Sequence, residues 1–488
     1  MPQRSFGTPI DSAITEWRDQ QTDTIQWAEN NPHRFLLINA PTGSGKTLIG
    51  GAIAEKGMPW RYLVATNYLQ DQVARTFLDV PTVRGRRHFE CPMLKPPGNS
   101  AQWGWCVEGD PCDHHMNSAP DRATMCDYYA QLDAGMDERA ISNYHSALYV
   151  PSLLNDVSTL VCDEAHNIER TLISRMEVRL THQYFDLFEP EADETAIREW
   201  AITTLRALPR QMGGKVARMR QQLLATGAYR NTWLQLWDDN GVTLTPIWGR
   251  AYASNLWAEV PRIILMSATL MGGSYAAELL GLPFGTFQYL DLPSTFPVEN
   301  RPVYFLPTVW MKYTMQDSDK QRQIDRMDEL IEMYVKKGTP FGLVHAVSNK
   351  LRDELLTRSR WRSIMTSDDG EHEVRVRKGL ASVLVAANRT EGWDGVGDLC
   401  RFIILPKVPF PSHSDPLVMA RREQDPRSYD YTTLTHVVQG VGRGVRHKED
   451  TCDTWILDRA WEPLYHSRKS WLPDSFLSAY HPKVRLEN

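Results

Sequence analysis

Short apolar runs recur along the chain, each bounded by glycine, proline or polar residues. The clearest runs are residues 34–40, 61–66, 158–164, 262–268, 341–346, 382–387, 401–406 and 453–458. Continuous apolar runs of this length are typical of strands that are buried on both faces of a sheet. Between them lie stretches with apolar residues near helical spacing, such as residues 321–337. This alternation predicts an α/β fold with parallel sheets.

The apolar runs fall into two sets, separated by a proline-rich stretch at residues 292–303. The second set predicts a parallel-sheet domain over residues 291–488. Two stretches interrupt the first set: residues 85–126 hold four cysteines with little regular pattern, and residues 171–252 look helical. We expect both to be insertions into the first domain. That domain is therefore predicted to consist of three segments, 1–84, 127–170 and 253–290.

The stretch "NAPTGSGKT", residues 39–47, follows an apolar run and precedes a predicted helix. Strand, glycine-rich loop and helix in this order are typical of a P-loop, whose backbone N–H groups turn toward phosphate oxygens. Lys46 is expected to reach the β- and γ-phosphates, and Thr47 to bind Mg²⁺. The residues predicted to bind nucleotide in this loop are Thr42, Gly43, Ser44, Gly45, Lys46 and Thr47.

The stretch "LVCDEAHNIE", residues 160–169, ends another apolar run with two carboxylates. Asp163 is predicted to hold Mg²⁺ through its water shell, and Glu164 to orient and deprotonate the attacking water. The alternative is an ordinary acidic turn after a strand. Together with the P-loop, the carboxylates predict hydrolysis of a nucleoside triphosphate. The base-reading "NKxD" of GTPases does not occur in the sequence.

Further motifs resemble those of superfamily 2 helicases. They are "RDQQ" (18–21), "DEAH" (163–166), "MSATL" (266–270), "TEGWDGVGD" (390–398) and "QGVGRGVR" (439–446). Within that superfamily the chain resembles the XPD/DinG family of iron–sulfur DNA helicases. This closer resemblance depends on "VRGRRHFEC" (83–91), "CDYYAQLDAG" to "ISNYHSAL" (126–148) and "LPKVPFPSHSDP" (405–416). It covers most of the chain in the family's order.

The resemblance implies two RecA-like motor domains and a DNA-stimulated, ATP-dependent helicase that moves 5′ to 3′ on single-stranded DNA. In this reading Arg18 and Gln21 contact adenine, and Gln439 orients water or the γ-phosphate. Arg443 and Arg446 would stabilise the charge on the transferring phosphoryl group from the second domain. For these two arginines the alternative is a basic helix that faces solvent or the phosphate backbone.

Four cysteines crowd one window, at Cys91, Cys106, Cys112 and Cys126. Four thiolates can hold Zn²⁺ or a [4Fe–4S] cluster, and their spacing does not decide between the two. The resemblance implies [4Fe–4S], because XPD/DinG proteins carry their cluster between the P-loop and the DEAH motif. The sequence departs from the family by lacking its close middle pair of cysteines. Zinc, and no metal at all, are the alternatives.

Basic and aromatic residues near the cysteines suggest contact with nucleic acid. Arg84, Arg86 and Arg87 precede the first cysteine and could contact phosphates, with a solvated basic loop as the alternative. Trp103 and Trp105 could stack on bases, although packing is the commoner role of an aromatic residue. The expected substrates are single-stranded and forked DNA, and RNA–DNA hybrids are left open.

Composition and charge set the outer limits of these expectations. The net charge of −6 does not exclude nucleic acid, because a motor can confine its basic residues to one groove. The sequence lacks an apolar run that could span a bilayer and a secretory signal, which predicts a cytoplasmic protein without a membrane partner. A monomer is expected, although the sequence holds no signal for the oligomeric state. The compact core suggests a bacterial or viral source, and DNA repair is one pathway that uses such motors. Two other functions are kept: a single-strand-stimulated translocase that remodels protein–DNA complexes, and a nucleotide-switched nucleic-acid-binding scaffold.

Overall fold

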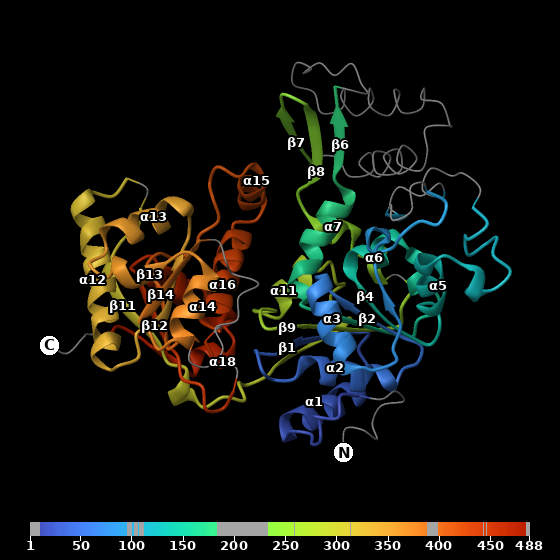
Figure 1. The fold of residues 1–488 in the computed structure, drawn as a ribbon, viewed down its shortest axis with the longest axis horizontal. Coiled ribbons are helices and arrows are strands. Elements are labelled where there is room, and N and C mark those ends of the chain that lie inside the picture. The colour runs from blue at the N-terminus through green and yellow to red at the C-terminus, as the bar shows by residue number, and fades with distance from the viewer. Residues whose placement is uncertain are drawn as a thin grey trace. The chain divides into compact units, whose positions relative to one another are not determined.

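The structure is a computed structural model, and its described residues form two compact units (Figure 1). The first unit takes most of the chain up to Tyr289, and the second takes Leu290 onward together with the short segments Asn39–Gly45 and Ala268–Gly273. Each unit is built around a seven-stranded sheet, and both have the RecA-like α/β architecture. The described residues are 10–94, 100–101, 106, 112–182, 233–257, 259–312, 314–387, 399–442, 444–445 and 447–484.

The sheet of the first unit has the strand order β10-β1-β9-β5-β2-β4-β3. Its strands are β1 (Phe35–Asn39), β2 (Trp60–Val64), β3 (Thr82–Val83), β4 (Arg139–Asn143), β5 (Thr159–Asp163), β9 (Arg262–Ser267) and β10 (Phe287–Asp291). Every residue of β1, β2 and β5 is buried, as the continuous apolar runs predicted. Parallel pairing of β5 with both β2 and β9 aligns the carboxyl ends of these strands at one edge of the sheet.

Helices cover this sheet, and the helix after β1 packs closely on it. A Cβ atom added at Gly50 in this helix would lie 2.5 Å from Met266 Cε and 2.9 Å from Val161 Cγ1. Glycine therefore lets the helix lie directly on β5 and β9. The helices of the unit are α1 (Asp19–Glu29), α2 (Lys46–Glu55), α3 (Asn67–Thr76), α5 (Asp127–Ala134), α6 (Tyr144–Tyr149), α7 (Ile168–Met176), α10 (Ser254–Trp257) and α11 (Ser274–Leu279).

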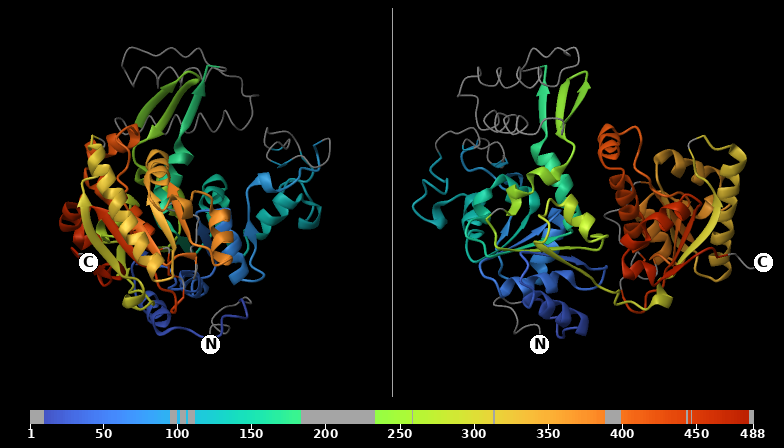
Figure 2. Two further views of the ribbon diagram at one scale, coloured as in Figure 1. Left: turned by 60° about the vertical axis from the view of Figure 1, so that its left-hand side comes forward. Right: turned by 180° about the vertical axis from the view of Figure 1, so that it is seen from behind.

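A second, three-stranded antiparallel sheet follows α7 in the order β6-β8-β7. Its strands are β6 (Val178–Thr181), β7 (Trp233–Asp238) and β8 (Gly241–Pro246). They extend from α7 away from the large sheet, which Figure 2 shows from two other sides. The sequence predicted helix over 171–252, but the described flanks of that segment contain these strands. The stretches with the helical pattern fall within 183–232, outside the described residues.

The second unit has the strand order β13-β14-β12-β15-β16-β11-β17. Its strands are β11 (Val303–Val309), β12 (Phe341–Ala346), β13 (Met365–Thr366), β14 (Ser382–Ala387), β15 (Phe402–Leu405), β16 (Asp453–Asp458) and β17 (Tyr480–His481). The pairs β12–β14, β12–β15 and β15–β16 are parallel. All the apolar runs named in the sequence form strands in one sheet or the other.

Helices of the second unit present apolar stripes to its sheet. Helix α12 buries Ile324, Met327, Ile331 and Tyr334, whose three- and four-residue spacing places them on one face. The helices are α12 (Asp317–Lys336), α13 (Asn349–Arg358), α14 (Asp369–Arg377), α15 (Pro416–Gln424), α16 (Arg427–Val441), α17 (Trp461–Arg468) and α18 (Asp474–Leu477). Within the described residues, no helix combines the length and apolar character that crossing a membrane requires.

Candidate nucleotide site and cysteine cluster

The candidate catalytic residues lie at the ends of three adjacent strands of the first sheet. Strand β9 lies between β1 and β5, so the turns that follow these strands meet at one sheet edge. The P-loop follows β1, Asp163 and Glu164 end β5 and its turn, and Ser267 ends β9. Parallel α/β sheets bind ligands at this carboxyl edge. The arrangement therefore gathers residues from three separate sequence motifs into one place.

The P-loop has the backbone conformation that its glycines allow. Gly43 and Gly45 have φ angles of 80° and 81°, where a side chain would be strained. Helix α2 then begins at Lys46, so the first N–H groups of the helix lack carbonyl partners inside it. Together with the helix dipole, such N–H groups bind phosphate.

Lys46 and Glu164 face each other within the first unit. The Lys46 Nζ atom lies 3.5 Å from Glu164 Oε1. Burial alone would raise the pKa of Glu164, but the nearby charges of Lys46 and His166 outweigh it, so its pKa lies below the ordinary value. Glu164 is therefore ionised at neutral pH and able to accept a proton or a water hydrogen bond.

Asp163 is more deeply buried than Glu164 and has the opposite shift. Burial, with the charge of Glu164, raises the pKa of Asp163 to about 6, although Lys46 opposes this. Its Oδ2 atom accepts a hydrogen bond of 3.0 Å from the Tyr62 hydroxyl, and Oδ1 accepts one of 2.9 Å from the Glu164 N–H. A buried carboxylate with few compensating charges nearby is a suitable ligand for a divalent cation. The cation would offset the free-energy cost of ionising the carboxylate.

A hydrogen-bonded network joins Glu164 to the end of β9. The Ser267 hydroxyl donates to Glu164 Oε2 over 3.3 Å, and His166 Nδ1 lies 2.7 Å from Ser267 Oγ. The Asn167 amide lies 2.9 Å from the other ring nitrogen of His166. This network connects the candidate base with the "MSATL" segment, so that a movement of one alters the orientation of the other.

Glu164 has a strained backbone, with φ 52° and ψ 47°. A non-glycine residue in this left-handed region costs on the order of 1 kcal/mol. Such strain is tolerated where the surrounding structure fixes the residue, which its side-chain contacts with Lys46 and Ser267 do here. The strain is consistent with a functional carboxylate.

The structure describes only some of the other residues that are predicted to contact the nucleotide. Gln21 is buried, and its side chain accepts a 3.1 Å hydrogen bond from the Arg18 N–H at the start of α1. Gln439 lies in the last turn of α16 in the second unit. Arg443 and Arg446 lie outside the described residues. The adenine and phosphoryl contacts of these residues stay predictions.

The four predicted cysteine ligands gather in the first unit. Burial raises the pKa of Cys112, and the neighbouring thiols of Cys106 and Cys91 add to the shift. Burial likewise raises the pKa of Cys126, with further effects from Cys106 and Cys112. Thiols that influence each other in this way lie near one another. Among the described residues, however, no group of three ligand-type side chains has the geometry of a preformed metal site.

Arg86 is held beside these cysteines. Its guanidinium carbon lies 4.5 Å from the ring centre of Tyr128 and 5.1 Å from that of Tyr129. It donates to Cys106 Sγ over 3.0 Å and to the Tyr129 hydroxyl over 2.7 Å. The prediction that this arginine contacts phosphate is therefore disfavoured, because its donors are engaged within the cysteine segment.

The other two arginines of this stretch differ from each other. Arg84 pairs with Asp71, whereas Arg87 is exposed. Trp103 and Trp105, the predicted stacking residues, lie outside the described part of the chain. Of the three arginines, Arg87 is the one best placed for phosphate contact.

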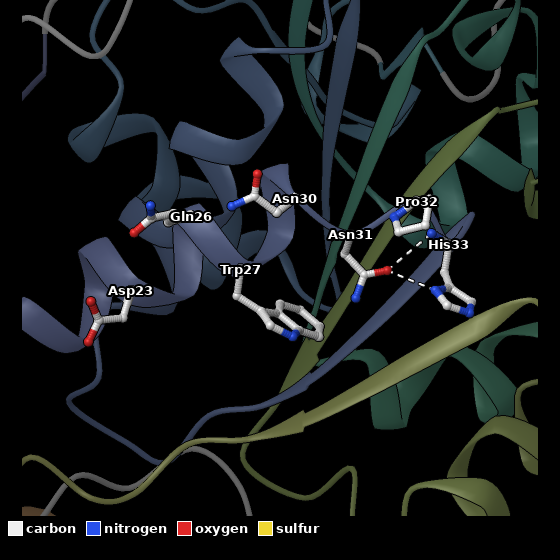
Figure 3. Close-up of a pocket in the computed structure, with 7 residues that line it drawn as sticks. All are labelled: Asp23, Gln26, Trp27, Asn30, Asn31, Pro32 and His33. Carbon is white, nitrogen blue, oxygen red and sulfur yellow. Dashed lines mark hydrogen bonds between the residues drawn. The ribbon is translucent and has the colours of Figure 1, made fainter.

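A hollow of ≈ 450 Å³ lies elsewhere on the first unit. Asp23, Gln26, Trp27 and Asn30 line it from α1 and the turn that follows, and the other lining residues are Asn31, Pro32 and His33 (Figure 3). The Arg262 guanidinium, at the start of β9, donates to the carbonyls of Asn31 and His33. The hollow therefore lies at the amino edge of the sheet, opposite the candidate catalytic residues, and none of them lines it.

Comparison with known proteins gives consistent matches. A family model described as "Helicase C-terminal domain" matches residues 325–475. The ATP-dependent DNA helicase XPD of Sulfolobus acidocaldarius is 21% identical over 548 aligned residues, which cover 93% of this chain and 97% of that protein. The ATP-dependent DNA helicase DinG of Photobacterium profundum is 24% identical over 226 residues, 42% of this chain and 32% of that protein.

Solved structures match over nearly the whole chain. A structure titled XPD helicase has a TM-score of 0.61 at 17% identity, covering 96% of this chain and 100% of that one. A structure titled XPD apo has a TM-score of 0.57 at 16% identity, covering 95% and 100%. At these identities the likeness shows the fold, which is that of two RecA-like units.

Proposed function

We propose that this chain, a superfamily 2 helicase of the XPD/DinG type, hydrolyses ATP to translocate along single-stranded DNA and unwind duplex DNA. The observation that carries the proposal is the meeting of Lys46, Asp163 and Glu164 at the carboxyl edge of the first sheet. The relatives named as ATP-dependent DNA helicases support the choice of nucleotide and of substrate.

In the proposed mechanism, ATP phosphates bind the N-terminus of α2 and the ammonium of Lys46. Thr47 and Asp163 would hold Mg²⁺, which when bound would neutralise charge on the phosphates. Glu164, ionised beside Lys46, orients water for attack on the γ-phosphate. Ser267 and His166 then link this carboxylate to the "MSATL" segment.

The finer features are also proposals. Arg18 and Gln21 contact adenine, and Gln439, Arg443 and Arg446 act on the γ-phosphate from the second unit. Movement is 5′ to 3′, on single-stranded or forked DNA, by a monomer. RNA–DNA hybrids are a second substrate class, because the motifs do not read the 2′-hydroxyl.

A positively charged patch on the first unit supports contact with nucleic acid. Its charge comes from Arg87 and Arg170, with His88 and His145 beside them, and all four residues are exposed. Burial lowers the pKa of His145, and the charges of Arg170 and Arg87 lower it further. The pKa of His88 is also lowered, by burial and by the charges of Arg87 and Arg84. The two histidines are therefore neutral at neutral pH, and the attraction for phosphate comes from the two arginines.

We propose that Cys91, Cys106, Cys112 and Cys126 hold a [4Fe–4S] cluster, with zinc as the alternative. Four thiolates are a donor set that either group takes, although the described residues do not present them as a preformed site. The bound group would cross-link a segment that has little apolar core of its own. Cys106→Ser should lose the metal and unwinding while retaining ATP binding. Retained unwinding by the metal-free variant would contradict this role.

Unwinding by anaerobically purified protein tests the proposed function. The substrates are duplexes with either a 5′ or a 3′ single-stranded tail, with ATP, and Lys46→Ala is the control. We expect strand separation from the 5′ tail only, and none with the variant. Unwinding from the 3′ tail would overturn the direction. DNA-stimulated hydrolysis without unwinding would favour the translocase, and slow hydrolysis that ignores DNA would favour the scaffold.

A further inference from the structure

Tyr62 lies in the middle of β2 and is fully buried, yet its hydroxyl reaches the candidate metal residues. Strand β2 pairs with β5, which ends at Asp163. The hydroxyl donates to Asp163 Oδ2 over 3.0 Å. Tyr62 has the sequence pattern of a core residue. Its side chain nevertheless contacts the carboxylate that is expected to bind Mg²⁺.

The Tyr62 hydroxyl keeps its proton. Burial and the charge of Asp163 raise the pKa of Tyr62 well above its ordinary value. Tyr62 therefore remains a neutral phenol, and in the 3.0 Å hydrogen bond it is the donor and the Asp163 carboxylate the acceptor.

These contacts restrict the Asp163 carboxylate at both oxygens. Oδ2 accepts from Tyr62, and Oδ1 accepts from the Glu164 N–H over 2.9 Å. Each carboxylate oxygen can accept more than one hydrogen bond, so the remaining lone pairs are available to a cation or its water shell. Partners behind a metal ligand commonly fix its orientation and strengthen metal binding.

We propose that Tyr62 is a positioning residue that fixes the orientation of the Asp163 carboxylate for the nucleotide-bound divalent cation. The inference rests on the proposed ATP site and goes beyond it by naming what sets the affinity of that site for the cation. Tyr62 does not touch nucleotide or metal in this role. It acts through the Asp163 carboxylate, to which its hydroxyl donates.

Tyr144 offers a matched control. It is also fully buried, and its hydroxyl donates over 2.7 Å to the main-chain carbonyl of Asp163 rather than to its carboxylate. Replacement of either tyrosine by phenylalanine removes one buried hydrogen bond to Asp163 and leaves the ring in place. A merely structural effect would therefore be similar in the two variants.

The experiment measures Mn²⁺ binding to the protein–ADP complex by the loss of the free-ion EPR signal. We expect Tyr62→Phe to weaken Mn²⁺ binding about tenfold, with binding of metal-free ADP unchanged. Tyr144→Phe should stay within about twofold of the original protein, since the carboxylate keeps its donor. Equal affinities in all three proteins, or equal losses in both variants, would overturn the inference. Absence of Mn²⁺–ADP binding by the original protein would overturn the proposed function itself.

A double-mutant cycle gives an independent test through the same signal. If Tyr62 acts through Asp163, then adding Tyr62→Phe to Asp163→Asn should change Mn²⁺ affinity much less than Tyr62→Phe alone. Fully additive losses would show that Tyr62 acts elsewhere and would overturn the proposal.

Discussion

At the scale of single residues, Asp163 combines a functional position with a cost to the fold. Burial and Glu164 raise its pKa to about 6, above the value near 4 of an unfolded chain. Ionisation therefore opposes folding. The loss of folding free energy caused by ionised Asp163 reaches its full size above pH ~6. It disappears as the pH falls below ~4, where Asp163 is protonated in both the folded and the unfolded protein.

Asp163→Asn should stabilise the metal-free protein at pH ~7.5 by on the order of 1–3 kcal/mol, and the gain should shrink as the pH falls from ~6 to ~4. Denaturant unfolding at several pH values measures this. Asp238→Asn is the control, because Arg179 lowers the pKa of Asp238 and the sign is reversed. Asp238 stabilises the fold only when ionised. A stability loss in Asp163→Asn at pH ~7.5 would contradict the assigned shift.

Glu164→Gln should lower DNA-stimulated ATP turnover by about 100-fold or more while ATP binding persists, because the amide cannot accept a proton from water. Glutamine keeps the size and the hydrogen bond from Ser267. Steady-state hydrolysis and binding of a fluorescent ATP analogue measure the two effects separately. Turnover close to that of the original protein would remove Glu164 from the mechanism.

Sequence reasoning identifies Lys46, Asp163 and Glu164 because each belongs to a short motif with its own chemistry. Tyr62 carries no such signal. In the run 61–66 it has the appearance of an ordinary strand residue, and its contact depends on the pairing of β2 with β5. Arg86 is a related case, because its contacts with Cys106 and two tyrosines arise only after the segment folds.

At the scale of elements, the apolar runs predict most of the central strands and miss the edge strands, together with β4 and β11 next to them. Strand β10 has no fully buried residue and lies at the end of its sheet, and β3, β13 and β17 contain two residues each. Edge strands are buried less, so their sequences are less apolar. Strands β6 and β7 were missed for a similar reason, because both are only partly buried. Strand β8 is mostly buried, but its threonines interrupt the apolar run.

Helix α2 supplies a prediction at this scale, because it carries Lys46 and Thr47 and packs closely on the sheet. Gly50→Ala should destabilise the fold by about 1–3 kcal/mol, since the new methyl group would overlap Met266 and Val161. It should also raise the KM for ATP by displacing the P-loop. Gly85→Ala is the control, because a Cβ there meets no atom within 4 Å. Unchanged stability in Gly50→Ala would mean that α2 has room to move.

At the scale of the whole molecule, the net charge of −6 makes local placement of positive charge decisive for DNA binding. A uniformly acidic surface would repel a phosphate backbone at all but high salt. The patch of Arg87, His88, His145 and Arg170 offers an exception on the first unit. Composition alone could not predict it, because its members come from separate segments that the fold brings together.

Arg87→Ala should weaken binding of single-stranded DNA severalfold and reduce the slope of log affinity against log salt by about 0.7, the value for one lost contact with a single strand. Fluorescence anisotropy between low and moderate salt measures both. Arg86→Ala is the matched comparison one residue away. Because Arg86 contacts Cys106 and the tyrosine rings, its loss should lower metal content and stability first. Equal salt slopes for Arg87→Ala and the original protein would place the DNA path away from this patch.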